Sequence, residues 1–282
     1  MKATCALVQM NFSDAKDDNV GRGADLVRAA GRDGAQIICL PELATTQYFC
    51  YRMNREFMHL AEPVTGPSIQ TIAAAAREAD AWVVMPFYEE GDDGQLYNSA
   101  AVIDRSGDVA GVYRKNVIPI MSFEGVEGVE KFYFRPGNLG YPVFETDLGI
   151  TIGITICYER HFPEGPRALA LAGADVIFVP TATPAGGHMW EVELRAMAIA
   201  NLLWVGGVNR VGRDRGEAVS DMDFYGGALF SGPDGVVAAQ AATEADEIVM
   251  TEIDTDLSAK LRDDWGFFRD RRPDIYGALT AP

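Results

Sequence analysis

The chain has 282 residues, of which 48% are hydrophobic and 23% are charged, an ordinary globular composition. Acidic residues outnumber basic ones by 41 to 24, which gives a formal net charge of −17. This balance argues against nucleic-acid binding, because that polyanion is bound by clustered Lys and Arg side chains.

Short apolar runs of strand type alternate along the chain with helix-like segments. Strands are expected at Thr4–Gln9, Ile37–Leu40, Trp82–Pro86, Ser99–Ile103, Thr151–Ile156, Val176–Val179, Trp204–Val208 and Gly227–Ser231. Helices are expected at Val20–Arg32, Ser68–Ala79, Phe162–Ala172 and Trp190–Asn201. Several strands are apolar throughout, which indicates that both of their faces are covered. The alternation predicts an α/β layered protein, and because no Pro-, Ser- or Gly-rich linker divides it, a single domain over residues 1–282.

Glycine-containing turns at residues 91–94, 106–108 and 232–235 are typical of hairpin or tight-turn connections. No GxGxxG opens a helix and no GxxxxGK[ST] occurs, so nucleotide binding has no support in the sequence.

Four cysteines are present, and they form no CxxC pair. The spacing of Cys5, Cys39, Cys50 and Cys157 suits neither a zinc site nor a dense disulfide framework. The first ten residues are typical of a strand rather than of a signal peptide, and no apolar run approaches the length of a membrane span. We therefore expect a cytoplasmic protein with reduced thiols and no membrane partner.

Three reactive side chains each follow an apolar strand: Glu42, Lys115 and Cys157. Taken singly, a surface glutamate, a solvent-facing lysine and a small core cysteine are the ordinary interpretations. Their shared placement at strand exits favours one functional site, since ligands bind at the carboxyl ends of strands in α/β sheets. Cys157 also precedes a helix-like segment, whose first free N–H groups would stabilise an anion and make a thiolate easier to form.

The segments around these residues resemble the signature blocks of the nitrilase superfamily of carbon–nitrogen hydrolases. The blocks are Leu40-Pro41-Glu42-Leu43, Tyr113-Arg114-Lys115 and Ile156-Cys157-Tyr158-Glu159. The resemblance covers nearly the whole chain, and it is strongest to the branch of β-ureidopropionase and N-carbamoyl amino acid amidohydrolases. It implies a four-layer αββα sandwich that pairs into a homodimer or a larger homo-oligomer. The C-terminal segment, about residues 262–282, is expected at an oligomer interface.

The resemblance also implies the roles of the site residues. Cys157 would attack a carbon that bears nitrogen, and Glu42 would act as general base. The ammonium of Lys115 and the backbone N–H of Tyr158 would hold the oxyanion. A fourth catalytic residue, Glu130, would hold Lys115 and orient the amino group of the substrate. This chemistry requires no metal or organic cofactor.

The prediction of the substrate depends on Arg160. It lies three places after Cys157, and a guanidinium can bind a carboxylate through two parallel hydrogen bonds. Members that hydrolyse N-carbamoyl amino acids have Arg at the matching position, so the resemblance implies hydrolysis of N-carbamoyl-β-alanine or a related compound. The products would be the amino acid, carbon dioxide and ammonia. The alternative for Arg160 is an internal salt bridge with Glu159 or Glu164.

Three departures from the superfamily pattern leave other substrates open. Val117 replaces a usual histidine, the segment 120–129 is longer than usual, and residues 226–228 differ from the usual Gly-Thr-Ser. The first two are expected in loops at the pocket mouth, with Glu124 and Glu127 on the loop surface.

The alternatives are an aliphatic amidase, an N-carbamoylputrescine amidase, an N-carbamoyl-D-amino-acid hydrolase, a nitrilase or an inactive scaffold. Tyr48, which follows Glu42 closely, is expected to line the pocket.

Overall fold

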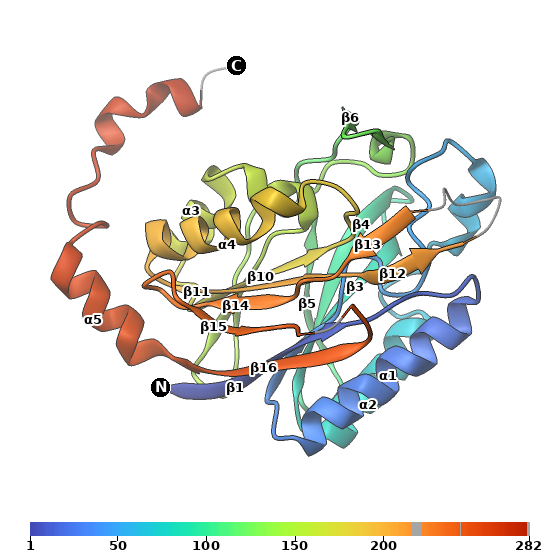
Figure 1. Ribbon diagram of the computed structural model, residues 1–282, viewed down its shortest axis with the longest axis horizontal. Coiled ribbons are helices and arrows are strands. Elements are labelled where there is room, and N and C mark those ends of the chain that lie inside the picture. Colours follow the sequence, from blue (N-terminus) through green and yellow to red (C-terminus); the bar gives the residue numbers. More distant parts are fainter. Residues whose placement is uncertain (216–221, 243, 281–282) are drawn as a thin grey trace.

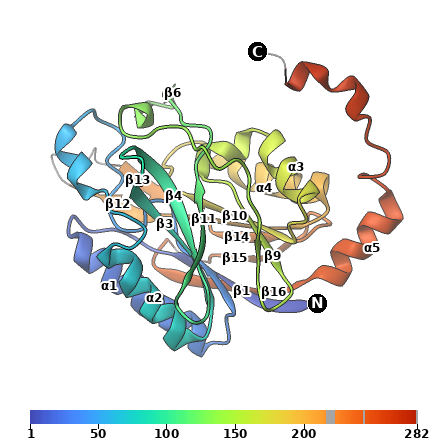
Figure 2. The ribbon, with the colours of Figure 1, turned by 180° about the vertical axis from the view of Figure 1, so that it is seen from behind.

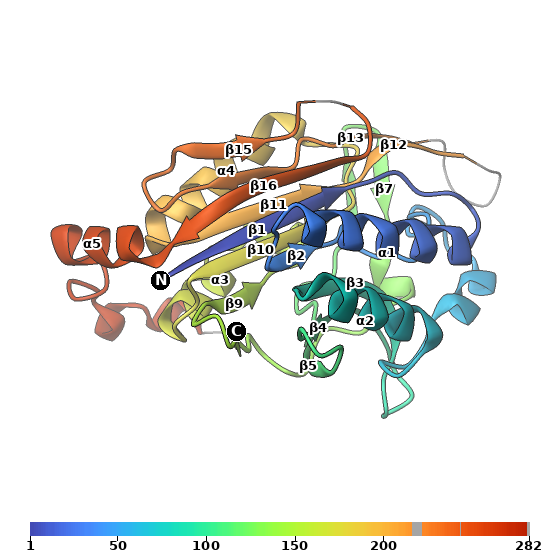
Figure 3. The same ribbon diagram turned by 90° about the horizontal axis from the view of Figure 1, so that it is seen from below.

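The computed structural model describes residues 1–215, 222–242 and 244–280. Within these residues the strands form two six-stranded sheets and two short two-stranded ones. The two large sheets pack face to face, and helices cover the outer face of each (Figures 1 and 3). The predicted four-layer αββα sandwich is therefore confirmed.

The first sheet has the strand order β16-β1-β2-β3-β4-β5. Its strands are β1 (Lys2–Gln9), β2 (Ile37–Cys39), β3 (Trp82–Glu90), β4 (Leu96–Ile103), β5 (Val109–Arg114) and β16 (Glu247–Asp254). Strands β1, β2 and β3 run parallel, while β4 is antiparallel to both of its neighbours. Helices α1 (Lys16–Arg32) and α2 (Pro67–Ala79) cover the outer face of this sheet (Figure 3).

The second sheet has the strand order β15-β14-β11-β10-β9-β8. Its strands are β8 (Phe144–Glu145), β9 (Thr151–Ile154), β10 (Val176–Thr181), β11 (Trp204–Asn209), β14 (Leu229–Ser231) and β15 (Val237–Gln240). Helices α3 (Glu164–Leu171) and α4 (Gly187–Asn201) cover its outer face (Figure 1). Strands β9, β10 and β11 run parallel, so their carboxyl ends lie at the same edge.

The remaining elements lie outside the two large sheets. They are the pair β6 (Met121–Phe123) and β7 (Val126–Gly128), the pair β12 (Val211–Asp214) and β13 (Met222–Tyr225), and α5 (Thr255–Trp265). Short 3-10 helices span Arg55–Leu60, Glu130–Phe132, Cys157–His161, Pro273–Ile275 and Gly277–Leu279. Helix α5 leads into a C-terminal segment, drawn in red, that lies outside the two sheets and contacts α3 through Phe268 and Arg167 (Figures 1 and 2).

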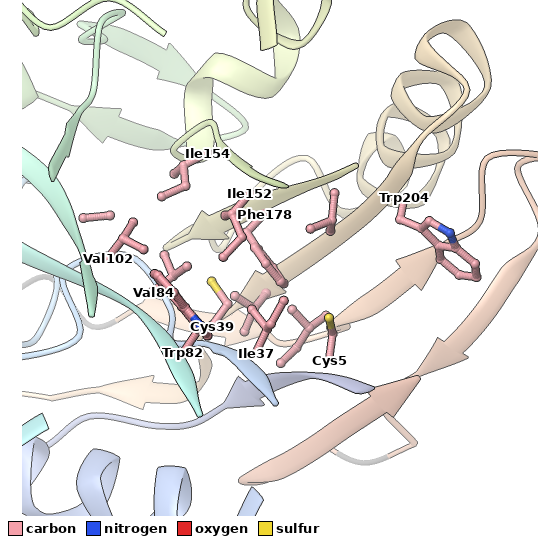
Figure 4. Packing of buried hydrophobic residues seen from close by; sticks show 14 of the residues in the cluster. Cys5, Ile37, Cys39, Trp82, Val84, Val102, Ile152, Ile154, Phe178 and Trp204 are labelled. Atoms are coloured by element: carbon pink, nitrogen blue, oxygen red, sulfur yellow. The ribbon is translucent and has the colours of Figure 1, made fainter. Parts of the chain in front are cut away.

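The sandwich is held together because alternate residues of one strand enter different apolar layers. In β1, Cys5 and Leu7 lie in the cluster between the sheets, whereas Ala6 and Val8 pack beneath the helices. Figure 4 shows Cys5 and Phe178, from opposite sheets, within the cluster between them. Full burial of one large aliphatic or aromatic side chain contributes about 1.5–3 kcal/mol, so this layer contributes much of the free energy of folding.

All eight expected strands and all four expected helices are present, with shifted ends. Strand β9 stops at Ile154 rather than Ile156, and α3 begins at Glu164 rather than Phe162, because a 3-10 turn intervenes. Strand β14 begins at Leu229 because the two preceding glycines, Gly226 and Gly227, have φ of +66° and +74°. The glycine turns connect β3 to β4, β4 to β5 and β14 to β15, as predicted.

The oligomer interface expected near residues 262–282 stays a prediction, and residues 281–282 lie outside the described residues. No helix in the described ranges combines the length and hydrophobicity that a membrane crossing requires.

Two glycines of α1 provide a test of the packing between α1 and α2. A Cβ on Gly31 would lie 2.5 Å from Cβ and 2.8 Å from Cα of Ala79, whereas a Cβ on Gly21 would meet nothing within 4 Å. We expect Gly31→Ala to destabilise the protein by about 1–3 kcal/mol, because the helices must separate. Gly21→Ala should instead stabilise it by up to about 1 kcal/mol through helix propensity. Urea unfolding measures the change in the free energy of unfolding for both variants. Equal changes would contradict the close contact between Gly31 of α1 and Ala79 of α2.

Candidate active site

Glu42, Lys115 and Cys157 each follow the carboxyl end of a strand, as predicted. Glu42 follows β2, Lys115 comes directly after β5, and Cys157 follows β9. Because β4 is antiparallel to both β3 and β5, strands β2 and β5 run in the same direction and end at one edge of the first sheet. The second sheet contributes Cys157, so the site lies where the ends of the two sheets meet.

Lys115 lies at the centre of this site, and its side chain has no exposed surface. Its Nζ donates hydrogen bonds to Oε1 of Glu42 at 2.9 Å and to both carboxylate oxygens of Glu130 at 2.9 and 2.7 Å. Burial alone would lower the pKa of Lys115, but the charges of Glu130 and Glu42 raise it well above its ordinary value. Lys115 is therefore a fixed ammonium throughout the physiological range.

One carboxylate oxygen of Glu42 accepts hydrogen bonds, and the other is open to a ligand or a proton. Oε1 accepts hydrogen bonds from Lys115 and, at 2.8 Å, from Nδ2 of Asn98 on β4. Within the described part of the chain, the buried Oε2 has no hydrogen-bond partner. An unpaired buried acceptor is costly, so it marks a place where a proton or a polar group of a ligand can bind.

Glu130 begins the 3-10 helix Glu130–Phe132, and it is 1% exposed. Besides Lys115, its Oε1 accepts a hydrogen bond from the hydroxyl of Tyr48 at 2.6 Å. Burial raises the pKa of Glu130, with a further increase from Glu42, and the neighbouring ammonium of Lys115 only partly offsets them. The structure thus brings Glu130 to Lys115 as expected, and it places Tyr48 beside Glu130 at the pocket wall.

Cys157 is the first residue of the 3-10 helix Cys157–His161, and its φ is +52°. A left-handed backbone is unfavourable for a residue with a Cβ, and it occurs where a fold holds a reactive side chain in a set direction. Burial, followed by the charge of Glu42, raises the pKa of the Cys157 thiol to about 12, although Lys115 and Arg160 act in the opposite direction. The resting sulfur is therefore a protonated thiol that needs a base.

Glu159 is a site residue to which the sequence assigned no function. Its carboxylate accepts hydrogen bonds from the backbone N–H of Ile156 at 2.7 Å, from that of Asn116 at 2.9 Å and from the hydroxyl of Tyr113. It therefore ties the turn that carries Cys157 to the strand end that carries Lys115. Burial raises the pKa of Glu159 to about 7.

Asn98 was also missed as a site residue. The sequence signal for both residues was their place in segments that resemble the superfamily: Tyr97-Asn98-Ser99-Ala100 for Asn98 and Ile156-Cys157-Tyr158-Glu159 for Glu159.

Arg160 lies beside Cys157, and Nη1 donates a hydrogen bond to the Cys157 carbonyl at 3.1 Å. Its salt-bridge partner is Glu193 on α4, with Nε 3.0 Å from Oε2, so the expected alternatives Glu159 and Glu164 were wrong. The other oxygen of Glu193 lies 2.5 Å from Nδ1 of His161. Nη2 forms no hydrogen bond within the described residues, and it lies near Gly186 in the pocket wall.

A pocket opens beside Cys157, and its wall includes Tyr158 and Arg160, as expected. Much of the remaining wall is apolar, with Met121, Phe123 and Val126 contributed by β6 and β7. The segment 116–129 was expected to be a loop, but β6 and β7 form a hairpin within it.

The hairpin turn comes from left-handed backbone at Glu124 and Gly125, whose φ values are +52° and +80°. Glu124 was expected to be simple loop surface, yet its Oε2 accepts a hydrogen bond from the N–H of Gly186 at 2.9 Å. Glu127 is exposed on β7, consistent with the surface position expected for it. Among the described residues, no group of three His, Cys, Asp or Glu side chains is arranged to hold a metal ion.

The fold and this cluster of side chains define a carbon–nitrogen hydrolase, and comparison with known proteins agrees. Residues 4–263 match the family described as carbon-nitrogen hydrolase. An N-carbamoylputrescine amidase of Oryza sativa subsp. japonica is 36% identical over 99% of this chain and 95% of its own. A beta-ureidopropionase of Arabidopsis thaliana is 34% identical over 96% of this chain and 69% of its own.

The crystal structure of a carbon-nitrogen hydrolase from Helicobacter pylori G27 has a TM-score of 0.90 and 29% identity, and it covers 100% of this chain and 99% of its own. The chain therefore belongs to the carbon–nitrogen hydrolase family of the nitrilase superfamily. It is an amidohydrolase enzyme.

The charge that Glu42 places near the thiol gives a testable prediction. Because this charge raises the pKa of Cys157, Glu42→Gln should lower that pKa and speed alkylation of Cys157 by iodoacetamide at pH 8. Each decrease of one in the pKa gives about tenfold more thiolate while the thiol is mostly protonated. Mass spectrometry measures the rate, with Cys157→Ala as the control for the three other cysteines. Slower alkylation would instead show that Glu42 already holds the thiol proton in the resting enzyme.

Proposed function

We propose that the chain hydrolyses N-carbamoyl compounds, with Cys157 as nucleophile, Glu42 as general base and Lys115 as oxyanion stabiliser. The observation that supports this proposal most strongly is the buried ammonium of Lys115 between the carboxylates of Glu42 and Glu130. These charges act on the protonated thiol of Cys157. Both curated relatives described above have names that specify N-carbamoyl or ureido substrates, which supports this class of substrate.

In the first half of the reaction, the open Oε2 of Glu42 takes the proton of the Cys157 thiol. The sulfur then bonds to the carbonyl carbon of the carbamoyl group, and the carbonyl electron pair moves onto oxygen. The Lys115 ammonium and the Tyr158 N–H stabilise that oxyanion. When the carbonyl re-forms, a C–N bond breaks and Glu42 gives its proton to the departing nitrogen.

In the second half, Glu42 removes a proton from water, which attacks the thioester-type intermediate and releases the Cys157 thiol and a carbamic acid. The carbamic acid then loses carbon dioxide, which breaks the second C–N bond. Overall, one water converts the N-carbamoyl compound to an amine, carbon dioxide and ammonia. Glu130 keeps the Lys115 ammonium in place throughout, because both of its oxygens accept hydrogen bonds from Nζ. A base that gives and takes protons twice works best when its pKa lies near the working pH.

Substitutions in this cluster test the proposed chemistry. Cys157→Ala should abolish ammonia release from N-carbamoyl-β-alanine and from N-carbamoylputrescine alike. Lys115→Met should lower kcat by about 10²–10³, as the loss of one oxyanion donor does in other hydrolases. A coupled ammonia assay measures both, with circular dichroism to check folding. Near-normal turnover in a folded Lys115→Met variant would rule out its proposed role.

We infer that the part of the substrate beyond the carbamoyl group carries a carboxylate, and that this carboxylate binds near Arg160. Nη2 of Arg160 lies at the pocket wall, and the apolar surroundings would strengthen a hydrogen bond between the guanidinium and a carboxylate. Glu193 already pairs with Nε, so the carboxylate would share the guanidinium rather than neutralise it alone. N-carbamoyl-β-alanine and related N-carbamoyl amino acids are the substrates that fit.

N-carbamoylputrescine is the second candidate, and sequence similarity favours it. The Oryza sativa relative, an N-carbamoylputrescine amidase, is 36% identical to this chain, whereas the beta-ureidopropionase is 34% identical. Glu193 could contribute to binding a cationic substrate, because it lies next to Arg160 and is only partly buried.

The two candidates differ in the charge of the substrate end that would approach Arg160. We expect Arg160→Met to raise KM for N-carbamoyl-β-alanine at least about tenfold, because a charge-assisted hydrogen bond is lost. The KM for N-carbamoylputrescine should change little or fall. Because Arg160 also holds the Cys157 carbonyl, the ratio of the two substrates is the measurement. Wild-type preference for N-carbamoylputrescine, together with an unchanged ratio, would favour the second candidate.

A further inference from the structure

Arg210, which follows β11, is fully buried, yet it belongs to none of the steps described above. Its Nη2 donates hydrogen bonds to the carbonyl of Glu42 at 2.8 Å and to that of Leu43 at 2.7 Å, and Nε lies 3.2 Å from the Glu42 carbonyl. The guanidinium lies 4.0 Å from the ring centroid of Phe12. Arg210 therefore contacts the backbone that carries Glu42 rather than its carboxylate.

The backbone at Glu42 needs such support. Leu43 has a φ of +50°, a conformation that is unfavourable for a residue with a side chain. Two successive carbonyls, those of Glu42 and Leu43, accept hydrogen bonds from the same guanidinium, and the Leu43 carbonyl also accepts one from the N–H of Thr46 at 3.1 Å. Without Arg210, the Glu42 carbonyl would lose its side-chain donors and the Leu43 carbonyl would keep only Thr46, and the turn could relax to a more favourable conformation.

Asp214 connects Arg210 to the second carboxylate of the site. Asp214 is 2% exposed, and its Oδ2 lies 3.6 Å from Nη1 of Arg210. The same oxygen accepts a hydrogen bond from the backbone N–H of Tyr48 at 2.8 Å. The hydroxyl of Tyr48 in turn donates to Glu130. One buried ion pair thus supports Glu42 on one side and, through Tyr48, Glu130 on the other.

We propose that Arg210 and Asp214 are positioning residues that set the two carboxylates on either side of the Lys115 ammonium. This proposal rests on the proposed function, in which Glu42 is the general base and Glu130 holds the Lys115 ammonium. An arginine suits the task, since its planar guanidinium donates to several carbonyls at fixed angles and stays charged. A lysine would keep the charge but lose that geometry.

Arg210→Lys tests the proposal, and Gly31→Ala is its matched control, because it disturbs the packing of α1 and α2 and touches no residue of the site. We expect Arg210→Lys to lower kcat by about 10–100-fold, since small displacements of a catalytic group can cost that much. KM should change less than about threefold. The Gly31→Ala variant should keep its kcat at a temperature where both variants are folded.

Alkylation of Cys157 supplies a readout that does not depend on turnover. A displaced Glu42 would change the electrostatic field at the thiol, so Arg210→Lys should shift the alkylation rate in the same direction as Glu42→Gln. If Arg210→Lys does not fold, Asp214→Asn replaces it as the test. We expect a smaller loss of about three- to tenfold in kcat, because the amide oxygen of asparagine can still accept the hydrogen bond from the backbone N–H of Tyr48. A folded variant with the kcat and the alkylation rate of the wild type would overturn the proposal.

Failure of the proposed function is distinguishable from failure of this proposal. In the first case, the wild-type enzyme releases no ammonia from any N-carbamoyl compound, whatever residue 210 is. In the second case, the wild-type enzyme is active, and Arg210→Lys behaves like Gly31→Ala in both assays.

Discussion

The site depends on one buried interaction, the ammonium of Lys115 held between Glu42 and Glu130. Removing a charge from water is expensive, and the loss of one partner from a buried pair typically costs about 3–5 kcal/mol. Here Asn98 adds a hydrogen bond at Oε1 of Glu42 and Tyr48 adds one at Glu130, while Oε2 of Glu42 stays open among the described residues. Because the three charged groups come from three distant segments, the fold must be nearly complete before the cluster can form.

Burial and the same cluster together determine the state of the sulfur. Burial, followed by the charge of Glu42, disfavours a thiolate more than the cations of Lys115 and Arg160 favour it, so the proton stays on Cys157. Reactivity therefore arises only when a base removes that proton as the sulfur attacks. This differs from a cysteine that is activated in advance by a lowered pKa.

The sequence predicted the central strands well because they are covered on both faces and appear as continuous apolar runs. Strands β15 and β16 were missed because each lies at the edge of a sheet and is only partly buried: β15 is just four residues long, and polar residues interrupt β16. The positions of Glu42, Lys115 and Cys157 followed from strand ends and from resemblance. The supporting contacts of Glu193 and Arg210 could not be predicted, because they join segments whose packing no local pattern specifies.

The hairpin β6–β7 separates two properties that are often linked in an enzyme. Its side chains Met121, Phe123 and Val126 line the pocket, while Glu42, Lys115 and Cys157 follow strands of the two large sheets. Changes in these three side chains can therefore alter the shape and polarity that a substrate meets while Glu42, Lys115 and Cys157 stay on the sheets, provided that the end of the hairpin still places Glu130, two residues beyond Gly128. Substrate range and bond-breaking chemistry are in this way open to separate evolution, and directed evolution for a new amide has a natural starting point in residues 121–128.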